Sequence, residues 1–129
     1  MTGDVVALRA SVDLPTTSQS VPAARRIVQH LLAGWSAEAF CDDALLLLSE
    51  LVSNVVRHVA TRTPLRVELA LAGPVLHVAV FDGLPGLPLP RAAGVNGGYG
   101  LRLVAAVSDS WGSHDDLGGK RVWFELHRS

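Results

Sequence analysis

Four side chains that exchange protons or bind charged ligands recur at helical spacing in one short segment. Glu50, Asn54 and His58 follow one another at intervals of four residues, and Arg57 immediately precedes the histidine. On an α-helix with about 3.6 residues per turn, these side chains stand above one another on one flank. A carboxylate, an amide, a guanidinium and an imidazole would therefore project together, as a binding or catalytic site requires.

The same segment carries a separate apolar stripe. Apolar residues recur at i, i+3, i+4 and i+7 spacing, which predicts an amphipathic helix with one buried face. The stripe consists of Leu47, Leu48, Leu51, Val52, Val55 and Val59. The polar column thus runs along the shoulder of the buried face, where a semi-enclosed site could use it. The alternative is a half-exposed polar edge with ordinary surface chemistry, which Ser53 and Arg57 would fit well.

Two further segments contain residues suited to ligand binding. Asp82 and Gly83 end an apolar alternation, so the carboxylate is either part of a surface turn or an acceptor for the amino group of adenine. The glycine-rich run 97–100 is either a simple loop-to-helix turn or a set of free backbone N–H groups that can hold phosphate oxygens.

The first half of the chain predicts one strand and two helices that would position the polar column. Alternation over residues 5–14 predicts a strand that Pro15 ends. Ser20 can cap a helix over 21–33, with Gly34 just past its end. Asp42 or Asp43 can cap the long helix that follows, which should run to about residue 59.

The second half predicts two strand pairs and one helix. Strands over 65–71 and 75–81 should be joined by a hairpin turn, and strands over 110–114 and 121–127 form the final pair. Between the pairs, a proline-rich loop over 83–98 precedes a helix over 98–107, and loops of this length are usually functional. This β-α-α-β-β-α-β-β order predicts an α+β fold: a two-layer sandwich of a mixed, mostly antiparallel sheet covered on one face by three helices.

Composition favours a single domain over residues 1–129 and excludes several classes of protein. With 11 basic and 12 acidic residues, the net charge is −1, and Lys120 is the only lysine, so no basic stripe supports direct nucleic-acid binding. The lone Cys41 and the lack of a signal-peptide pattern lead us to expect a cytoplasmic protein. No apolar run is long enough to span a membrane.

The polar segments, taken together and in order, resemble the ATP-binding domain of the GHKL family, which has the Bergerat fold and includes histidine kinases and gyrase. The closest resemblance is to the short, single-domain branch of anti-sigma-factor serine kinases, and it covers about residues 24–126. The matching boxes are Glu50-x-x-x-Asn54-x-x-Arg57-His58, Val80-Phe81-Asp82-Gly83, Gly97-Gly98-Tyr99-Gly100-Leu101-x-Leu103-Val104, Trp111-Gly112 and Gly119-Lys120-x-Val122-Trp123-Phe124.

The resemblance implies a role for each member of the polar column. Asn54 would bind Mg²⁺ through its side-chain oxygen, which suits a hard ion that keeps several waters. Glu50 would act as general base on a serine hydroxyl of a partner or on a water. Arg57 would face phosphate charge, and His58 would support the same edge.

The resemblance also implies how the nucleotide would be held. Asp82 would accept a hydrogen bond from the adenine amino group, and Gly83 would leave room for the base. Gly98 and Gly100, which flank Tyr99 in the third box, would donate hydrogen bonds from their backbone N–H groups to the phosphates. Leu101 would pack beneath them, and residues 84–96 would form a lid. Many relatives carry a threonine near the adenine where this chain has Lys120.

The function implied is that of an ATP-binding, anti-sigma-factor-like regulator of transcription that phosphorylates a serine on an antagonist protein. Its partners would be a sigma factor, the antagonist or both, and two copies could form a homodimer. The main alternative is a non-catalytic ATP-binding switch protein of the same fold. A histidine-kinase core fits poorly, because we expect no dimerisation helix with a phospho-accepting histidine before the domain. A ligand-free structural domain would require every box to be coincidental.

Overall fold

A computed structural model describes residues 7–58, 63–82, 99–116 and 119–128. The described chain forms one five-stranded sheet and three α-helices, with the element order β1-α1-η1-α2-β2-β3-α3-β4-β5, where η1 is a short 3₁₀ segment. The expected α+β class and the expected order of strands and helices are both confirmed.

The sheet has the strand order β1-β2-β3-β5-β4. Its strands are β1 (Leu8–Leu14), β2 (Leu65–Ala72), β3 (Val75–Asp82), β4 (Ser110–Asp116) and β5 (Gly119–His127). All four neighbouring pairs are antiparallel, so the predicted antiparallel pairing is confirmed, whereas the predicted mixed character of the sheet is wrong. The β2–β3 turn pairs Ala72 with Val75 and places Gly73 at φ +59°, a left-handed conformation that glycine adopts readily.

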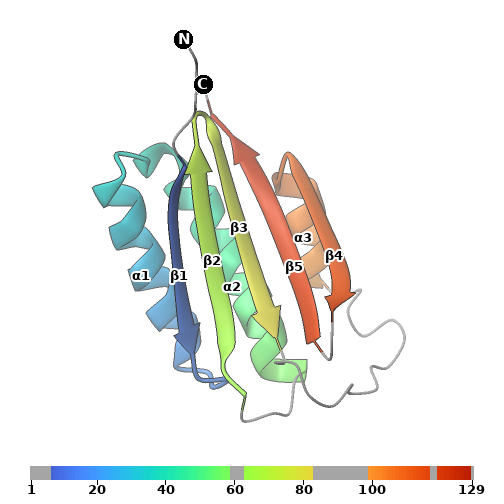
Figure 1. Ribbon diagram of the computed structural model, residues 1–129. Helices are drawn as coiled ribbons and strands as arrows, with labels where there is room; N and C mark the ends of the chain where they lie inside the picture. The colour runs from blue at the N-terminus through green and yellow to red at the C-terminus, as the bar shows by residue number, and fades with distance from the viewer. Residues whose placement is uncertain (1–6, 59–62, 83–98, 117–118, 129) are drawn as a thin grey trace.

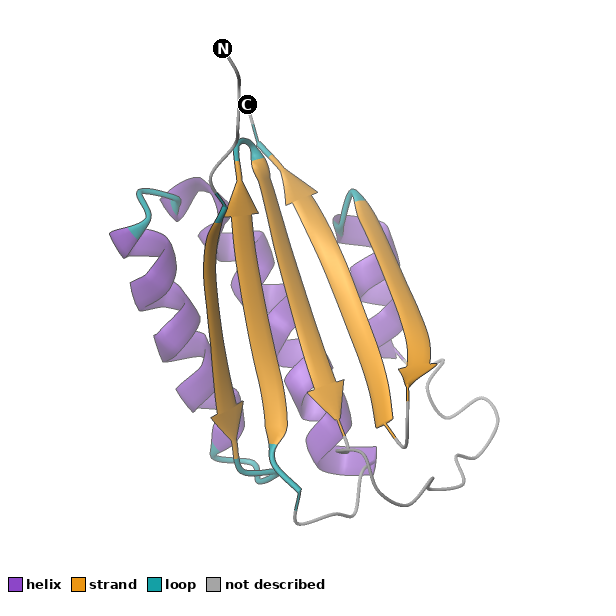
Figure 2. Ribbon diagram, in the orientation of Figure 1, coloured by secondary structure: helices purple, strands orange, loops and turns teal. Residues whose placement is uncertain are grey.

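The three helices lie on the same face of the sheet (Figures 1 and 2). They are α1 (Ser20–Gly34), α2 (Cys41–His58) and α3 (Tyr99–Val107). The largest fully buried side chains include Leu47, Leu48, Leu51 and Val52 from α2 and Phe124 from β5. The predicted apolar stripe of α2 is therefore confirmed as core as far as Val55; Val59 lies outside the described residues.

Both residues predicted to flank α1 belong to the helix instead, which spans Ser20–Gly34 rather than 21–33. Ser20 is a buried residue of the helix rather than its cap, and its hydroxyl donates to the Pro15 carbonyl. At the other end Gly34, predicted to lie just past the helix, still belongs to it, and Ser36 adopts a left-handed φ of +55°. The Ala37 N–H then donates to the Leu32 carbonyl at 2.7 Å and closes the helix end.

The start of α2 also differs from the prediction. The segment η1 (Glu38–Phe40) runs directly into α2, so the helix begins at Cys41 and Asp42 and Asp43 lie in its first turn. Their negative charges still stabilise the positive end of the helix dipole, although neither residue stands before the helix as a cap.

The opposite face of the sheet, which no described helix covers, is lined by paired polar and aromatic side chains. Arg121 donates to Glu68 at 3.3 Å and contacts His77 at 3.2 Å. His77 in turn bonds Glu125 at 3.0 Å and stacks on Trp123 with ring centroids 5.3 Å apart. These contacts pair polar side chains across strands on the face that the antiparallel sheet presents to solvent. Among the described residues, no helix is long and apolar enough to cross a membrane.

Candidate functional site

The segments predicted to carry chemistry meet at one end of the molecule. The C-terminal end of α2, the last residues of β3 and the first residues of α3 all lie at the lower end of the sheet in Figure 1. The start of β5 lies there too, because Asp82 at the end of β3 pairs with Lys120. Chain segments that are well separated in the sequence thus come together at this end of the sheet.

On α2, the structure places the predicted polar column at the edge of the buried face. Glu50 and Asn54 are half-buried and Arg57 is exposed. The Arg57 Nη2 donates to Asn54 Oδ1 at 3.1 Å, so the guanidinium holds the amide oxygen that the resemblance assigns to the metal. His58 is the last residue of α2, and its side chain lies outside what the structure describes.

A contact beside Glu50 was missed by the sequence analysis. Arg25 of α1 donates to Ser49 Oγ at 2.7 Å and to the Leu45 carbonyl at 3.1 Å, while the Ser49 hydroxyl donates to the same carbonyl at 2.7 Å. Arg25 therefore fastens α1 to the turn of α2 that carries Glu50. The only sequence signal of this contact is one of two adjacent arginines on α1, Arg25 and Arg26, and it does not identify the partner.

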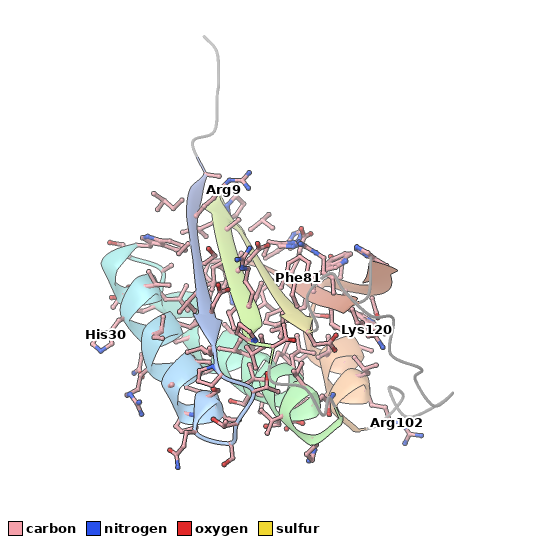
Figure 3. All side chains as sticks on the ribbon, turned by 60° about the horizontal axis from the view of Figure 1, so that its bottom comes forward. Arg9, His30, Phe81, Arg102 and Lys120 are labelled. Atoms are coloured by element: carbon pink, nitrogen blue, oxygen red, sulfur yellow. The ribbon has the colours of Figure 1, made fainter. Side chains whose placement is uncertain are left out.

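Asp82 is buried at the end of β3, as an acceptor in an enclosed site would be. Its exposed fraction is 6%, and its Oδ1 accepts a hydrogen bond from the Lys120 backbone N–H at 3.0 Å. Lys120 is buried to the same extent and lies directly opposite in the β3–β5 register. Figure 3 shows Lys120 beside α3 at the end of the molecule that faces the viewer.

The third segment is described only in part. α3 begins at Tyr99, so Gly100 lies in its first turn, and Leu101 is half-buried against the core. The predicted base-site residue Gly83, the phosphate-binding Gly98 and the lid over 84–96 lie outside the described residues.

The sequence also matches a known family along most of its length. The family model for the histidine kinase-like ATPase domain matches residues 14–126. The chain belongs to this family. The family expected from the residues at positions 50–58, 80–83 and 97–104 is thereby confirmed.

A solved structure supports the histidine kinase-like ATPase fold. The chain superposes on the crystal structure of the RsbU and RsbW domains of Rv1364c from Mycobacterium tuberculosis with a TM-score of 0.73 and 22% sequence identity. The match covers 93% of this chain and 32% of that chain, so this histidine kinase-like domain spans about a third of the longer protein. Comparison with curated proteins gave no match.

The donor atoms of this histidine kinase-like domain fit a magnesium ion. Mg²⁺ prefers oxygen ligands, keeps several waters and takes one or two oxygens from the protein. The half-buried Asn54 offers an amide oxygen, and the Glu50 carboxylate lies one turn earlier on the same flank of α2. Because Arg57 now donates to the Asn54 oxygen, that guanidinium would have to release it for a metal to bind.

A cavity lies elsewhere, on the open face of the sheet. It has a volume of about 410 Å³ and is lined by Arg9, Ser11, Glu68, His77 and Arg121, among others. Within it, the Arg121 guanidinium donates to Glu68 and contacts the His77 ring. We therefore assign the chemistry to the end of the sheet where Asp82 lies rather than to this hollow.

Proposed function

We propose that this histidine kinase-like domain binds ATP with Mg²⁺ at the end of the sheet formed by α2, β3 and α3, and acts as an anti-sigma-factor-like regulator. The observation that carries the proposal is the burial of the Asp82 carboxylate at the same end of the molecule as the polar flank of α2. In a chain of this family, the buried Asp82 carboxylate would accept a hydrogen bond from the purine. The side-chain oxygens on α2 would bind the metal that accompanies the phosphates.

The residues of α2 and α3 would divide the binding of the triphosphate between them. Asn54 would supply an oxygen ligand to the metal, which neutralises phosphate charge when bound. Arg57, once released from Asn54, would face the phosphates, and His58 would support that edge. The backbone N–H groups of Gly98 and Gly100, on either side of Tyr99, would donate hydrogen bonds to phosphate oxygens at the positive end of α3.

We propose further that the domain is a serine kinase in which Glu50 is the general base. The carboxylate would take the proton from a partner's serine hydroxyl. The serine oxygen would then attack the terminal phosphorus of ATP, and ADP would leave. The contact of Arg25 with Ser49 would help to position the turn that carries Glu50. The likeness to a protein with an RsbW domain supports an antagonist or a sigma factor as partner.

We also keep self-association and a cytoplasmic location as proposals. The face of the sheet that no described helix covers supports pairing with a second copy or with a protein partner. Light scattering coupled to size exclusion at several protein concentrations measures the oligomeric state directly. A mass of one chain at every concentration would contradict a stable homodimer.

Nucleotide titration tests the binding proposal. Calorimetry should show Mg²⁺-dependent ATP binding, weakened roughly tenfold or more in Asn54→Ala and in Asp82→Ala, because each loses a contact to a charged or buried group. Gln29→Ala, on the exposed side of α1, serves as the control and should bind like the unaltered protein. Absence of binding, or binding unchanged in both site variants, would reject the proposal.

The second candidate, a non-catalytic ATP-binding switch, requires a different measurement. Incubation with labelled ATP and an antagonist captured from native cells should give phosphoserine on the antagonist, and Glu50→Gln should abolish it without loss of ATP binding. ATP-dependent complex formation without any phosphoserine would favour the switch.

A further inference from the structure

Only two charged residues are buried in the part of the chain that the structure describes, and they are neighbours. Asp82 and Lys120 each expose 6% of their surface, and they are directly paired across β3 and β5. A buried charge persists only where opposite charge or hydrogen bonds compensate for the loss of water. Their coincidence at the end of the sheet that carries the candidate site therefore calls for a chemical explanation.

The alternation of the strands puts both side chains on the face that the helices cover. Asp82 follows the buried Val78 and Val80 at intervals of two, and Lys120 precedes the buried Phe124 by four residues. Residues directly opposite each other in an antiparallel pair have Cβ atoms about 4.5–5.5 Å apart. The four-carbon stem of the lysine can therefore bring its ammonium into the space that the carboxylate faces.

One hydrogen bond of the Asp82 carboxylate does not involve the lysine side chain. Its Oδ1 accepts from the backbone N–H of Lys120 at 3.0 Å, a bond that any residue except proline at position 120 can make. Replacing the lysine side chain thus removes one donor from the site and keeps this backbone hydrogen bond to Asp82.

We propose that Lys120 is a specificity-determining residue and that, together with Asp82, it lets the site bind 6-oxopurine nucleotides as well as ATP. This inference rests on the nucleotide site proposed above. Adenine presents an amino donor at C6 and an acceptor at N1, whereas guanine and hypoxanthine present a carbonyl acceptor at C6 and an N–H donor at N1. One acceptor and one donor can pair with either edge, provided that the donor can move.

Lysine provides that mobile donor. Its ammonium carries three N–H groups on a flexible stem, while the carboxylate of Asp82 is held by the backbone of β5. A threonine hydroxyl at this position would be a short and neutral donor by comparison. A charged donor bonds a carbonyl oxygen more strongly than a neutral donor does, so Lys120 favours the 6-oxo group in particular.

Binding by the unaltered protein is the first test. Calorimetric titration with Mg²⁺ complexes of ATP, GTP, inosine triphosphate and CTP compares the bases at constant phosphate charge. Inosine triphosphate lacks the 2-amino group of guanine, so it isolates the contacts at C6 and N1. We expect inosine triphosphate and GTP to bind within about tenfold of ATP, and CTP to bind more weakly than all three. A larger preference for ATP over inosine triphosphate would overturn the inference.

Variants at position 120 test the assignment to this lysine. Lys120→Met should weaken inosine triphosphate and GTP at least about tenfold, and ATP by less than about threefold, because the carbonyl oxygen loses a charged donor. Lys120→Gln keeps a neutral donor, so its affinity for inosine triphosphate and GTP should lie between that of the unaltered protein and that of Lys120→Met. Equal weakening of all four nucleotides, CTP included, would place Lys120 at the phosphates or in the fold and overturn the inference.

Arg9→Met is the matched control, because it also replaces one cation by methionine. Arg9 is exposed on β1 and lies far from Lys120 in Figure 3. Its nucleotide preferences should equal those of the unaltered protein, and thermal unfolding of each variant checks that it is folded. Should Lys120→Met fail to fold, the unaltered protein and Lys120→Gln still decide the question.

Failure of the inference can be separated from failure of the proposed function. If no nucleotide binds to the unaltered protein, both are rejected. If ATP binds in a manner that depends on Asp82 while Lys120→Met leaves the ratio of inosine triphosphate to ATP affinity unchanged, only the inference about Lys120 is rejected.

Discussion

Burial of single residues distinguishes the groups proposed to face ligands from those that cover the surface. Asp82 and Lys120 are buried although both are ionisable, while Asn54 and Glu50 are half-buried on the flank of α2. Ordinary surface carboxylates and amines are rarely enclosed unless they are paired. At this scale the site is therefore defined by enclosure as much as by residue type.

Cys41 shows how the local environment changes the reactivity of a single group. Burial raises the pKa of its thiol, and the carboxylates of Glu38 and Asp42 raise that pKa further. Because a raised pKa leaves less thiolate at any given pH, alkylation by iodoacetamide should be slower near pH 7 than for an exposed cysteine in a peptide. The pH at which alkylation reaches half its maximal rate should lie above the ordinary thiol value, as mass spectrometry at a series of pH values can measure.

The variant Asp42→Asn provides the control for this prediction. Removing one of the two carboxylates should move the pH profile of Cys41 alkylation downward, toward the ordinary value, while the burial contribution remains. A profile that coincides with that of the free peptide would contradict the prediction.

At the scale of elements, β4 and β5 fit together because one strand lacks a side chain where the other carries a large one. Gly112 of β4 lies directly opposite Trp123 of β5. A Cβ atom built on Gly112 would lie 2.6–2.7 Å from the indole of Trp123, too close for a real contact. The indole also stacks on His77 of β3, so it is held from both sides.

Gly112→Ala should therefore destabilise the protein by about 1–3 kcal/mol, because the rigid indole must shift to admit one methyl group. Urea unfolding followed by tryptophan fluorescence measures the change. Gly34→Ala is the matched control: a Cβ there meets nothing within 4 Å, and at the end of α1 alanine should be neutral or stabilising by up to about 1 kcal/mol. Equal stability of the two variants would show that Trp123 can move without cost.

At the scale of the whole molecule, the last strand ties the sheet to the start of α2. Arg128 forms an ion pair with Asp43 in the first turn of α2, and its guanidinium lies 5.5 Å from the centre of the Phe40 ring. Its backbone N–H donates to the Pro74 carbonyl at 2.8 Å. The C-terminal end of the described chain thus contacts both the β2–β3 turn and the helical layer.

Arg128→Ala should lower the free energy of unfolding by about 1–2 kcal/mol, since it removes a half-buried ion pair and a cation–π contact together. Arg26→Ala, at an exposed position of α1, removes the same charge and should change stability little. Chemical denaturation of both variants measures the difference. If Arg128→Ala lowers the free energy of unfolding as little as Arg26→Ala does, the contacts of Arg128 with Asp43 and Phe40 do not hold the two layers together.

The sequence alone determined the class of fold and most of its elements. Periodicities of 2 and of 3.6 residues depend on local alternation, so they identified five strands, three helices and the apolar stripe of α2 without knowledge of their neighbours. The polar boxes also identified the family, because each box is a set of residue types at fixed spacing and the boxes follow one another in a fixed order along the chain.

Tertiary structure decided what local patterns do not contain. Ser20 failed as a cap and Ser36 took the left-handed position because packing around α1, rather than propensity, fixes those backbones. The burial of Lys120 opposite Asp82 and the contact of Arg25 with Ser49 depend on strand register and helix packing. These join residues 20 to 40 positions apart, and no local pattern specifies which distant side chain will be met.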